Sequence, residues 1–135
     1  MRRQAESPDP GDLAELEARA WRALLAVSTA LGRGIPAADC DWLVPHGDHY
    51  VVSADAPGSA RALLDLYAPL CARRPLTIAH LGQSLDGNIA TASGDSYYVT
   101  GPDNVRHLHR LRALTSAVVV GAGTIERDDP QLTVR

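Results

Sequence analysis

The segment "SLDGNIATASGDS", residues 84–96, most constrains the fold of this chain because it interrupts apolar segments with residues that favour turns. It contains two glycines, two aspartates and four residues with small hydroxyl side chains. Glycine permits close backbone approach to a ligand, and hydroxyls provide oriented hydrogen bonds. The segment therefore predicts a polar loop, which is either a plain hairpin loop or a loop that contacts a ligand.

The residues around this loop predict an α/β order. Residues 76–82 ("LTIAHLG") are a candidate buried strand, residues 88–91 begin a short extended piece, and residues 96–101 ("SYYVTG") are rich in β-branched and aromatic residues. Residues 116–124 ("SAVVVGAGT") predict a strand and a tight turn. We expect a right-handed crossover between the strands.

Two helices are expected between and after these strands. The first runs from Thr100 to about Leu114, with Thr100 as its N-cap, Pro102 in its first turn and Asp103 at the positive end of the helix dipole. Residues 124–129 ("TIERDD") predict a second, short helical piece before a proline.

Residues 1–74 differ in sequence pattern from the rest of the chain and predict a small helical lead segment of unknown role. Apolar residues three and four apart predict a helix over residues 12–31, and residues 49–54 ("HYVVSA") predict a strand that follows a proline-containing loop. A second helix starts near Ser59, and Pro69 marks a kink or an early stop. His46, Asp48 and His49 are expected in a surface loop rather than a metal site, because further ligands are lacking.

Composition excludes several classes of function. The net charge of −3 lacks the clustered basic field that nucleic-acid binding requires, and no apolar run approaches a membrane-spanning length. Without a signal peptide we expect a cytoplasmic protein in which Cys40 and Cys71 are reduced and structural. All thirteen basic residues are Arg, so a phosphate must be bound by Arg or by backbone N–H groups.

The turn Gly121-Ala122-Gly123 follows an apolar run, as in dinucleotide-binding domains. The full fingerprint fails because its third glycine falls at Glu126. A glycine turn that lets a ligand lie close to the end of a strand remains the favoured interpretation.

Three motifs in order carry a more specific signal: "SLDGNIATASGDSYYVTGP", "HRLRA" (residues 109–113) and "VVVGAGTIERDDPQLTVR". Together they resemble the reductase domain of the bifunctional riboflavin-biosynthesis proteins. The resemblance implies a dihydrofolate-reductase-like α/β fold, a three-layer sheet with flanking helices, of which residues 75–135 would be the first half. The fold would thus be incomplete at the C-terminus, and we expect the 135-residue chain alone to be inactive.

The resemblance also implies an activity, which is NADPH-dependent reduction of 5-amino-6-(5-phosphoribosylamino)uracil or a related pyrimidine reduction. The ribose opens, C1′ accepts hydride and the ribityl product forms. Homodimers are implied as well, whereas the zinc deaminase signature of the partner domain is absent and no metal is expected. The alternative is a truncated, catalytically inactive interaction module.

Site residues follow from the resemblance position by position. The substrate contacts it implies are Ser96, Arg112, Leu132 and Arg135, and the cofactor contacts are Gly82, Tyr98, Thr124 and Asp128. His80 stands where many relatives carry Lys. It is either a core residue or an ionisable hydrogen-bond donor beside the substrate.

Overall fold

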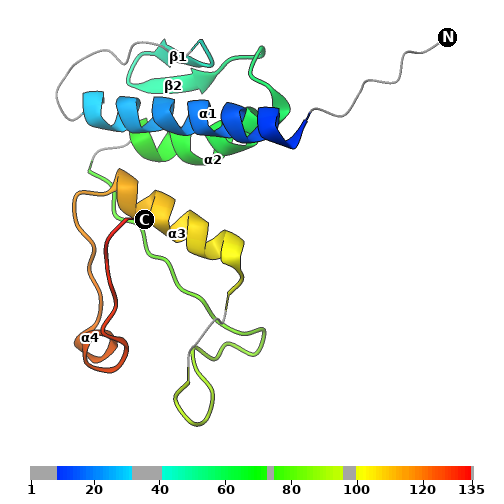
Figure 1. Ribbon diagram of the computed structural model, residues 1–135. Helices are drawn as coiled ribbons and strands as arrows, with labels where there is room; N and C mark the ends of the chain where they lie inside the picture. The colour runs from blue at the N-terminus through cyan, green and yellow to red at the C-terminus, as the bar shows by residue number, and fades with distance from the viewer. Residues whose placement is uncertain (1–8, 32–40, 73–74, 96–99, 135) are drawn as a thin grey trace. The chain divides into compact units, whose positions relative to one another are not determined.

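The computed structural model describes residues 9–31, 41–72, 75–95 and 100–134 (Figure 1). The chain divides between Leu76 and Thr77 into two units, and the two are described separately. The elements of the first unit are α1 (Pro10–Leu31), β1 (Leu43–His46), β2 (His49–Val52) and α2 (Gly58–Ala72). Those of the second are α3 (Pro102–Leu114) and α4 (Ala122–Asp128). The described residues therefore combine helices with one small two-stranded sheet.

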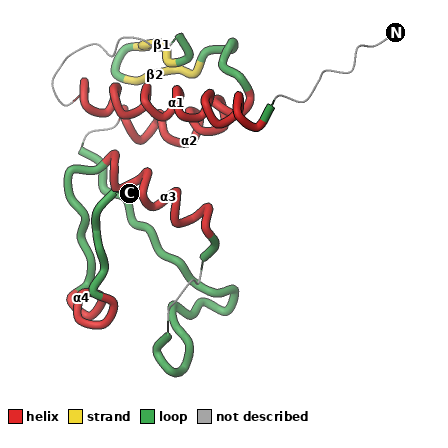
Figure 2. The backbone as a smooth tube through the Cα atoms, viewed as in Figure 1, coloured by secondary structure: helices red, strands yellow, loops and turns green. Residues whose placement is uncertain are grey.

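The first unit is built on the contact between α1 and α2 (Figure 2). Apolar residues spaced three and four apart give each helix one buried face. The residues buried there are Ala20, Leu24 and Val27 from α1 and Ala60, Leu64, Tyr67 and Cys71 from α2. The buried Cys71 thiol donates a weak hydrogen bond to the Leu24 carbonyl at 3.6 Å. Cys40 lies outside the described residues.

Both helices of the first unit were predicted, and of the two alternatives left open at Pro69 the early stop is wrong. Helix α1 begins two residues earlier than residue 12, and α2 begins one residue before Ser59. Helix α2 does not stop at Pro69 but continues to Ala72. Proline removes one backbone hydrogen bond inside a helix. Burial of Ala68 and Cys71 on either side of it favours the continued helix.

The sheet of the first unit is an antiparallel hairpin in which Leu43 pairs with Val52 and His46 pairs with His49. The strand over residues 49–52 was predicted, but residues 43–46 were assigned to a loop, and that assignment is wrong. Pro45 suggested the loop because it cannot donate a backbone hydrogen bond. A two-stranded hairpin has two edges, and an edge position tolerates that loss.

His46 and His49 therefore sit at the paired ends of two strands rather than in a surface loop. Their rings are 5.1 Å apart, and the His49 ring lies 3.1 Å from a carboxylate oxygen of Asp48. That hydrogen bond holds the pKa of Asp48 below its usual value. Among the described residues, no three His, Cys, Asp or Glu side chains are grouped so that they could hold a metal ion.

In the second unit both predicted helices are present. Pro102 occupies the first turn of α3 and Asp103 lies beside it, as expected. The N-cap is Gly101 rather than Thr100, and no described side chain caps this end of the helix. The hydroxyl of Thr100 instead accepts a hydrogen bond from the Asn104 amide at 2.8 Å. Leu111 and Leu114 form the buried face of α3.

The strands predicted for the second unit are not formed by its described residues. Residues 76–82 and 116–120 run without strand pairing, and residues 88–91 contain a bend at Ile89 and Ala90. Residues 96–99 of the third candidate lie outside the described residues. A β-branched segment becomes a strand only where a second segment completes its hydrogen-bond ladder. Within the described part of the unit no such ladder forms, so neither the expected three-layer sheet nor its crossover is present.

None of the helices in the described ranges combines the length and the apolar character that a membrane crossing requires.

The buried face of α2 gives a test of the first unit. Leu64→Ala removes a fully buried side chain and should lower the free energy of unfolding by about 2–5 kcal/mol. Leu66→Ala, two residues away on the same helix, removes a side chain that is 54% exposed. This substitution should change the free energy of unfolding by less than about 0.5 kcal/mol. Urea denaturation followed by circular dichroism measures both, and equal effects would contradict the packing described.

Candidate functional site

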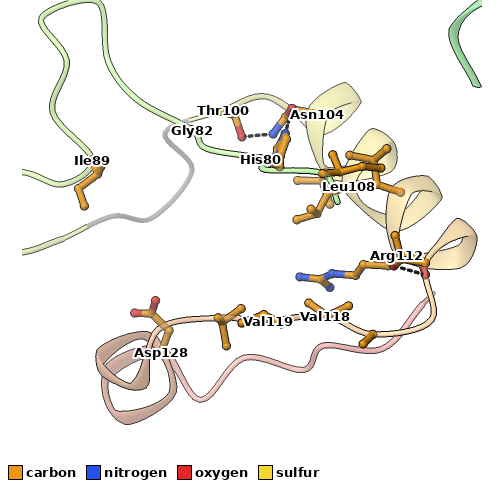
Figure 3. Close-up of a pocket in the computed structure, with 16 residues that line it drawn as sticks. His80, Gly82, Ile89, Thr100, Asn104, Leu108, Arg112, Val118, Val119 and Asp128 are labelled. Atoms are coloured by element: carbon orange, nitrogen blue, oxygen red, sulfur yellow. Dashed lines mark hydrogen bonds between the residues drawn. The ribbon is translucent and has the colours of Figure 1, made fainter. Parts of the chain in front are cut away.

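An open pocket of about 540 Å³ lies within the second unit (Figure 3). One face of α3 lines it, because Asn104, Leu108, Leu111 and Arg112 follow one another at steps of one, three and four residues. The irregular segments around residues 78–82 and 117–120 supply further walls, and Asp128 comes from the end of α4. The pocket is therefore lined by α3, which contributes several side chains, by the end of α4 and by loops that contribute the rest.

Helix α3 places the positively charged side chain of Arg112 in this pocket. Its guanidinium reaches from the helix toward the segment that carries Val118 and Val119 (Figure 3). One terminal nitrogen, Nη1, donates to the carbonyls of Gln131 and Thr133 at 3.3 and 3.5 Å. Its Nε–H is buried and finds no acceptor among the described residues. A guanidinium with an unused N–H donor is suited to bind an anionic oxygen such as that of a phosphate.

His80, Asn104 and Thr100 form a hydrogen-bonded chain on the opposite part of the pocket (Figure 3). The His80 Nε2 lies 3.1 Å from Asn104 Oδ1, and Asn104 Nδ2 donates to Thr100 Oγ1 at 2.8 Å. His80 is exposed, so its interpretation as a buried core residue is wrong for the described structure. The alternative role of His80, as an ionisable hydrogen-bond donor beside the substrate, stays a prediction.

The segment that carries His80 also approaches the start of α3 very closely. A Cβ atom built on Gly82 would lie 3.0 Å from Cγ2 of Thr100. Real Cβ contacts are seldom that short, and Thr100 is held in place by its hydrogen bond to Asn104. Glycine at position 82 is thus explained by backbone packing against Thr100.

The polar loop predicted from the sequence is present and consists of two successive turns. In the first, the amide of Asn88 and the hydroxyl of Ser84 both donate to the Asp86 carboxylate. These hydrogen bonds hold the pKa of Asp86 below its usual value, and the bond from Ser84 has the largest effect. In the second, the backbone N–H of Asp95 donates to Thr91 Oγ1 at 3.1 Å. Contact of this loop with a ligand stays a prediction.

The expected site residues are gathered only in part. His80, Gly82, Arg112 and Asp128 line the pocket. Thr124 is exposed and Leu132 is half-buried, and neither belongs to the pocket lining. Three further expected contacts, Ser96, Tyr98 and Arg135, lie outside the described residues.

Sequence reasoning missed Asn104, which joins two walls of the pocket. The only signal for it was its place four residues after Thr100, one helical turn away. That spacing was overlooked because Thr100 was interpreted as an N-cap, which would have used its hydroxyl on the backbone.

Comparison with known proteins identifies a family that the second unit resembles. Residues 75–135 match the family model described as the RibD C-terminal domain. The resemblance to the reductase domain of riboflavin-biosynthesis proteins is thereby confirmed over these residues. No solved structure matches the chain.

Individual relatives agree with this match. The riboflavin biosynthesis protein RibD of Aquifex aeolicus is 38% identical over 71 residues, which are 53% of this chain and 20% of that protein. The 2,5-diamino-6-ribosylamino-4(3H)-pyrimidinone 5′-phosphate reductase of Methanothermobacter thermautotrophicus is 44% identical over 61 residues, 45% of this chain and 28% of that protein. RibD of Escherichia coli is 47% identical over 55 residues, 41% and 15% of the two chains. The chain thus spans less than a third of the length of each of these relatives.

The close approach at position 82 gives a test of the second unit. Gly82→Ala should lower its free energy of unfolding by about 1–3 kcal/mol, because the added methyl group must displace Thr100. Gly123→Ala is the matched control, since its methyl group meets no atom within 4 Å and alanine favours the helix there. Hydrogen exchange of the α3 amides measures both, and a neutral Gly82→Ala would refute this packing.

Proposed function

We propose that the second unit contributes to an NADPH-dependent reductase that acts on 5-amino-6-(5-phosphoribosylamino)uracil or a closely related phosphorylated ribosylaminopyrimidine in riboflavin biosynthesis. The observation that carries the proposal is the match of residues 75–135 to the RibD C-terminal domain. A relative named as a 5′-phosphate reductase of a ribosylaminopyrimidinone supports the same class of substrate.

The chemistry of the pocket fits a phosphorylated substrate. Arg112 offers a buried Nε–H that has no acceptor among the described residues, and its delocalised charge attracts a phosphate. Ser96, Leu132 and Arg135 complete the proposed substrate contacts. His80 lines the opposite part of the same pocket, where it can contact the ribose or the base of the substrate.

NADPH supplies the hydride when it is bound. Gly82 offers a backbone surface without a side chain, and the Asp128 carboxylate in the pocket wall accepts hydrogen bonds such as those of ribose hydroxyls. Thr124 and Tyr98 are the other proposed cofactor contacts. The protein contributes orientation and the placement of charge, because the cofactor carries the redox chemistry.

The remaining parts of the proposal concern the whole protein. Residues 1–74 are a lead segment of unknown role, and residues 75–135 are the first half of a dihydrofolate-reductase-like reductase domain. The enzyme is cytoplasmic and acts as a homodimer.

A second candidate function is an interaction module without activity. The observation in its favour is apolar exposure in the second unit, where Leu81, Leu85 and Val119 are 70%, 110% and 93% exposed. Exposed apolar side chains are suited to contact with another protein surface. The two functions differ in a direct measurement, because only the first gives NADPH oxidation that depends on the pyrimidine substrate.

Arg112 provides the test of the proposed substrate. In the protein as its gene encodes it, Arg112→Ala should lower kcat/KM for the phosphorylated pyrimidine by about 10- to 150-fold, since a charge-assisted hydrogen bond is worth roughly 1.5–3 kcal/mol. Steady-state NADPH oxidation measures this effect. The loss should be smaller for the dephosphorylated substrate, which has no phosphate to bind.

Arg106→Ala is the control on the same helix, because Arg106 is exposed and pairs only loosely with Asp103 at 3.6 Å. It should leave kcat/KM within about twofold. If Arg112→Ala lowers kcat/KM equally for the phosphorylated and dephosphorylated substrates, Arg112 does not bind the phosphate.

A further inference from the structure

We propose that Asn104 is a positioning residue for His80, which it holds by Nε2 so that Nδ1 is left to accept a hydrogen bond from a hydroxyl or amino group of the substrate. The identity of that substrate rests on the function proposed above. The arrangement of the two side chains rests on the structure alone.

The direction of the hydrogen bonds carries the first step. Asn104 Nδ2 donates to Thr100 Oγ1 at 2.8 Å, which turns Oδ1 toward His80 Nε2 at 3.1 Å. A carbonyl oxygen only accepts, so Nε2 must carry the proton of the neutral ring. Nδ1 is then the unprotonated nitrogen and an acceptor.

The second step concerns what else could hold His80. Its segment has no strand pairing among the described residues, and its side chain is exposed. Asn104, by contrast, is half-buried in the first turn of a 13-residue helix. The rigid helix therefore orients the histidine through one side chain, and packing of Gly82 against Thr100 fixes the same segment two residues later.

His107 confines the ring from a second direction. It lies one turn after Asn104 on α3, and its ring centroid is 5.7 Å from that of His80 at an interplanar angle of 59°. Burial holds the pKa of His107 below its usual value, and electrostatic interaction with Arg110 and His80 acts in the same direction. The other charged groups in the pocket wall are Arg112 and Asp128. His80 is thus flanked on α3 by the Asn104 amide and the His107 imidazole.

Nitrogen NMR of the His80 ring at pH 9 tests the positioning in the 135-residue chain, without reference to activity. The wild type should show one tautomer, protonated at Nε2, with a proton that exchanges slowly with water. Asn104→Ala should give a mixture of tautomers and fast exchange. Asn104→Asp should restore the single tautomer, because a carboxylate oxygen also accepts from Nε2 and the Thr100 hydroxyl can donate to it.

Asp103→Asn is the control, since this exposed neighbour does not contact His80, and its spectrum should match the wild type. Circular dichroism establishes that each variant retains its helices. An unchanged His80 spectrum in a folded Asn104→Ala variant, or a wild-type ring protonated at Nδ1, would overturn the proposal.

A double-mutant cycle tests the consequence for the reaction. Asn104→Ala should lower kcat/KM about tenfold in the wild-type background and have little further effect beside His80→Gln, because it acts through His80. If the two substitutions instead lower kcat/KM by factors that multiply, Asn104 does not act through the His80 ring. If the wild type reduces no ribosylaminopyrimidine, the proposed function fails, and the tautomer measurement still decides whether Asn104 positions His80.

Discussion

Side-chain hydrogen bonds from α3 hold the candidate site together in place of a β ladder. Asn104 binds the segment that carries His80, and Arg112 binds the carbonyls of Gln131 and Thr133. Each bond joins a regular helix to a segment without regular structure. The pocket depends on these few contacts because the described residues of its loop walls have no neighbouring strands to fix them.

The helices could be predicted from the sequence because the information that specifies them is local. In α1 the apolar spacing alone predicts the face that packs on α2, and in α3 a proline and an aspartate mark the first turn. Strands depend on a partner that is often distant in sequence. Residues 76–82 and 116–120 have the composition of strands but lack paired neighbours among the described residues, and composition could not reveal that.

The site was predicted in part for a related reason. His80, Gly82, Arg112 and Asp128 come together in one pocket, and all four were carried over from a family resemblance rather than derived from periodicity. Thr124 and Leu132 came from the same resemblance and do not line the pocket. Asn104 was missed because its importance comes from a contact with His80, 24 residues earlier. No local pattern encodes a contact of that separation.

The energetics of these contacts bear on how the site would respond to a ligand. A hydrogen bond between side chains that water can reach contributes only about 0.5–1.5 kcal/mol. Segments held by one or two such bonds belong to the least stable part of a structure. A ligand that contacts both His80 and Arg112 would add bonds across the pocket and stabilise the folded second unit in proportion to its concentration and affinity. Such binding would be coupled to ordering of the loop walls. An anionic group would strengthen that coupling most at the buried Nε–H of Arg112, which has no acceptor among the described residues.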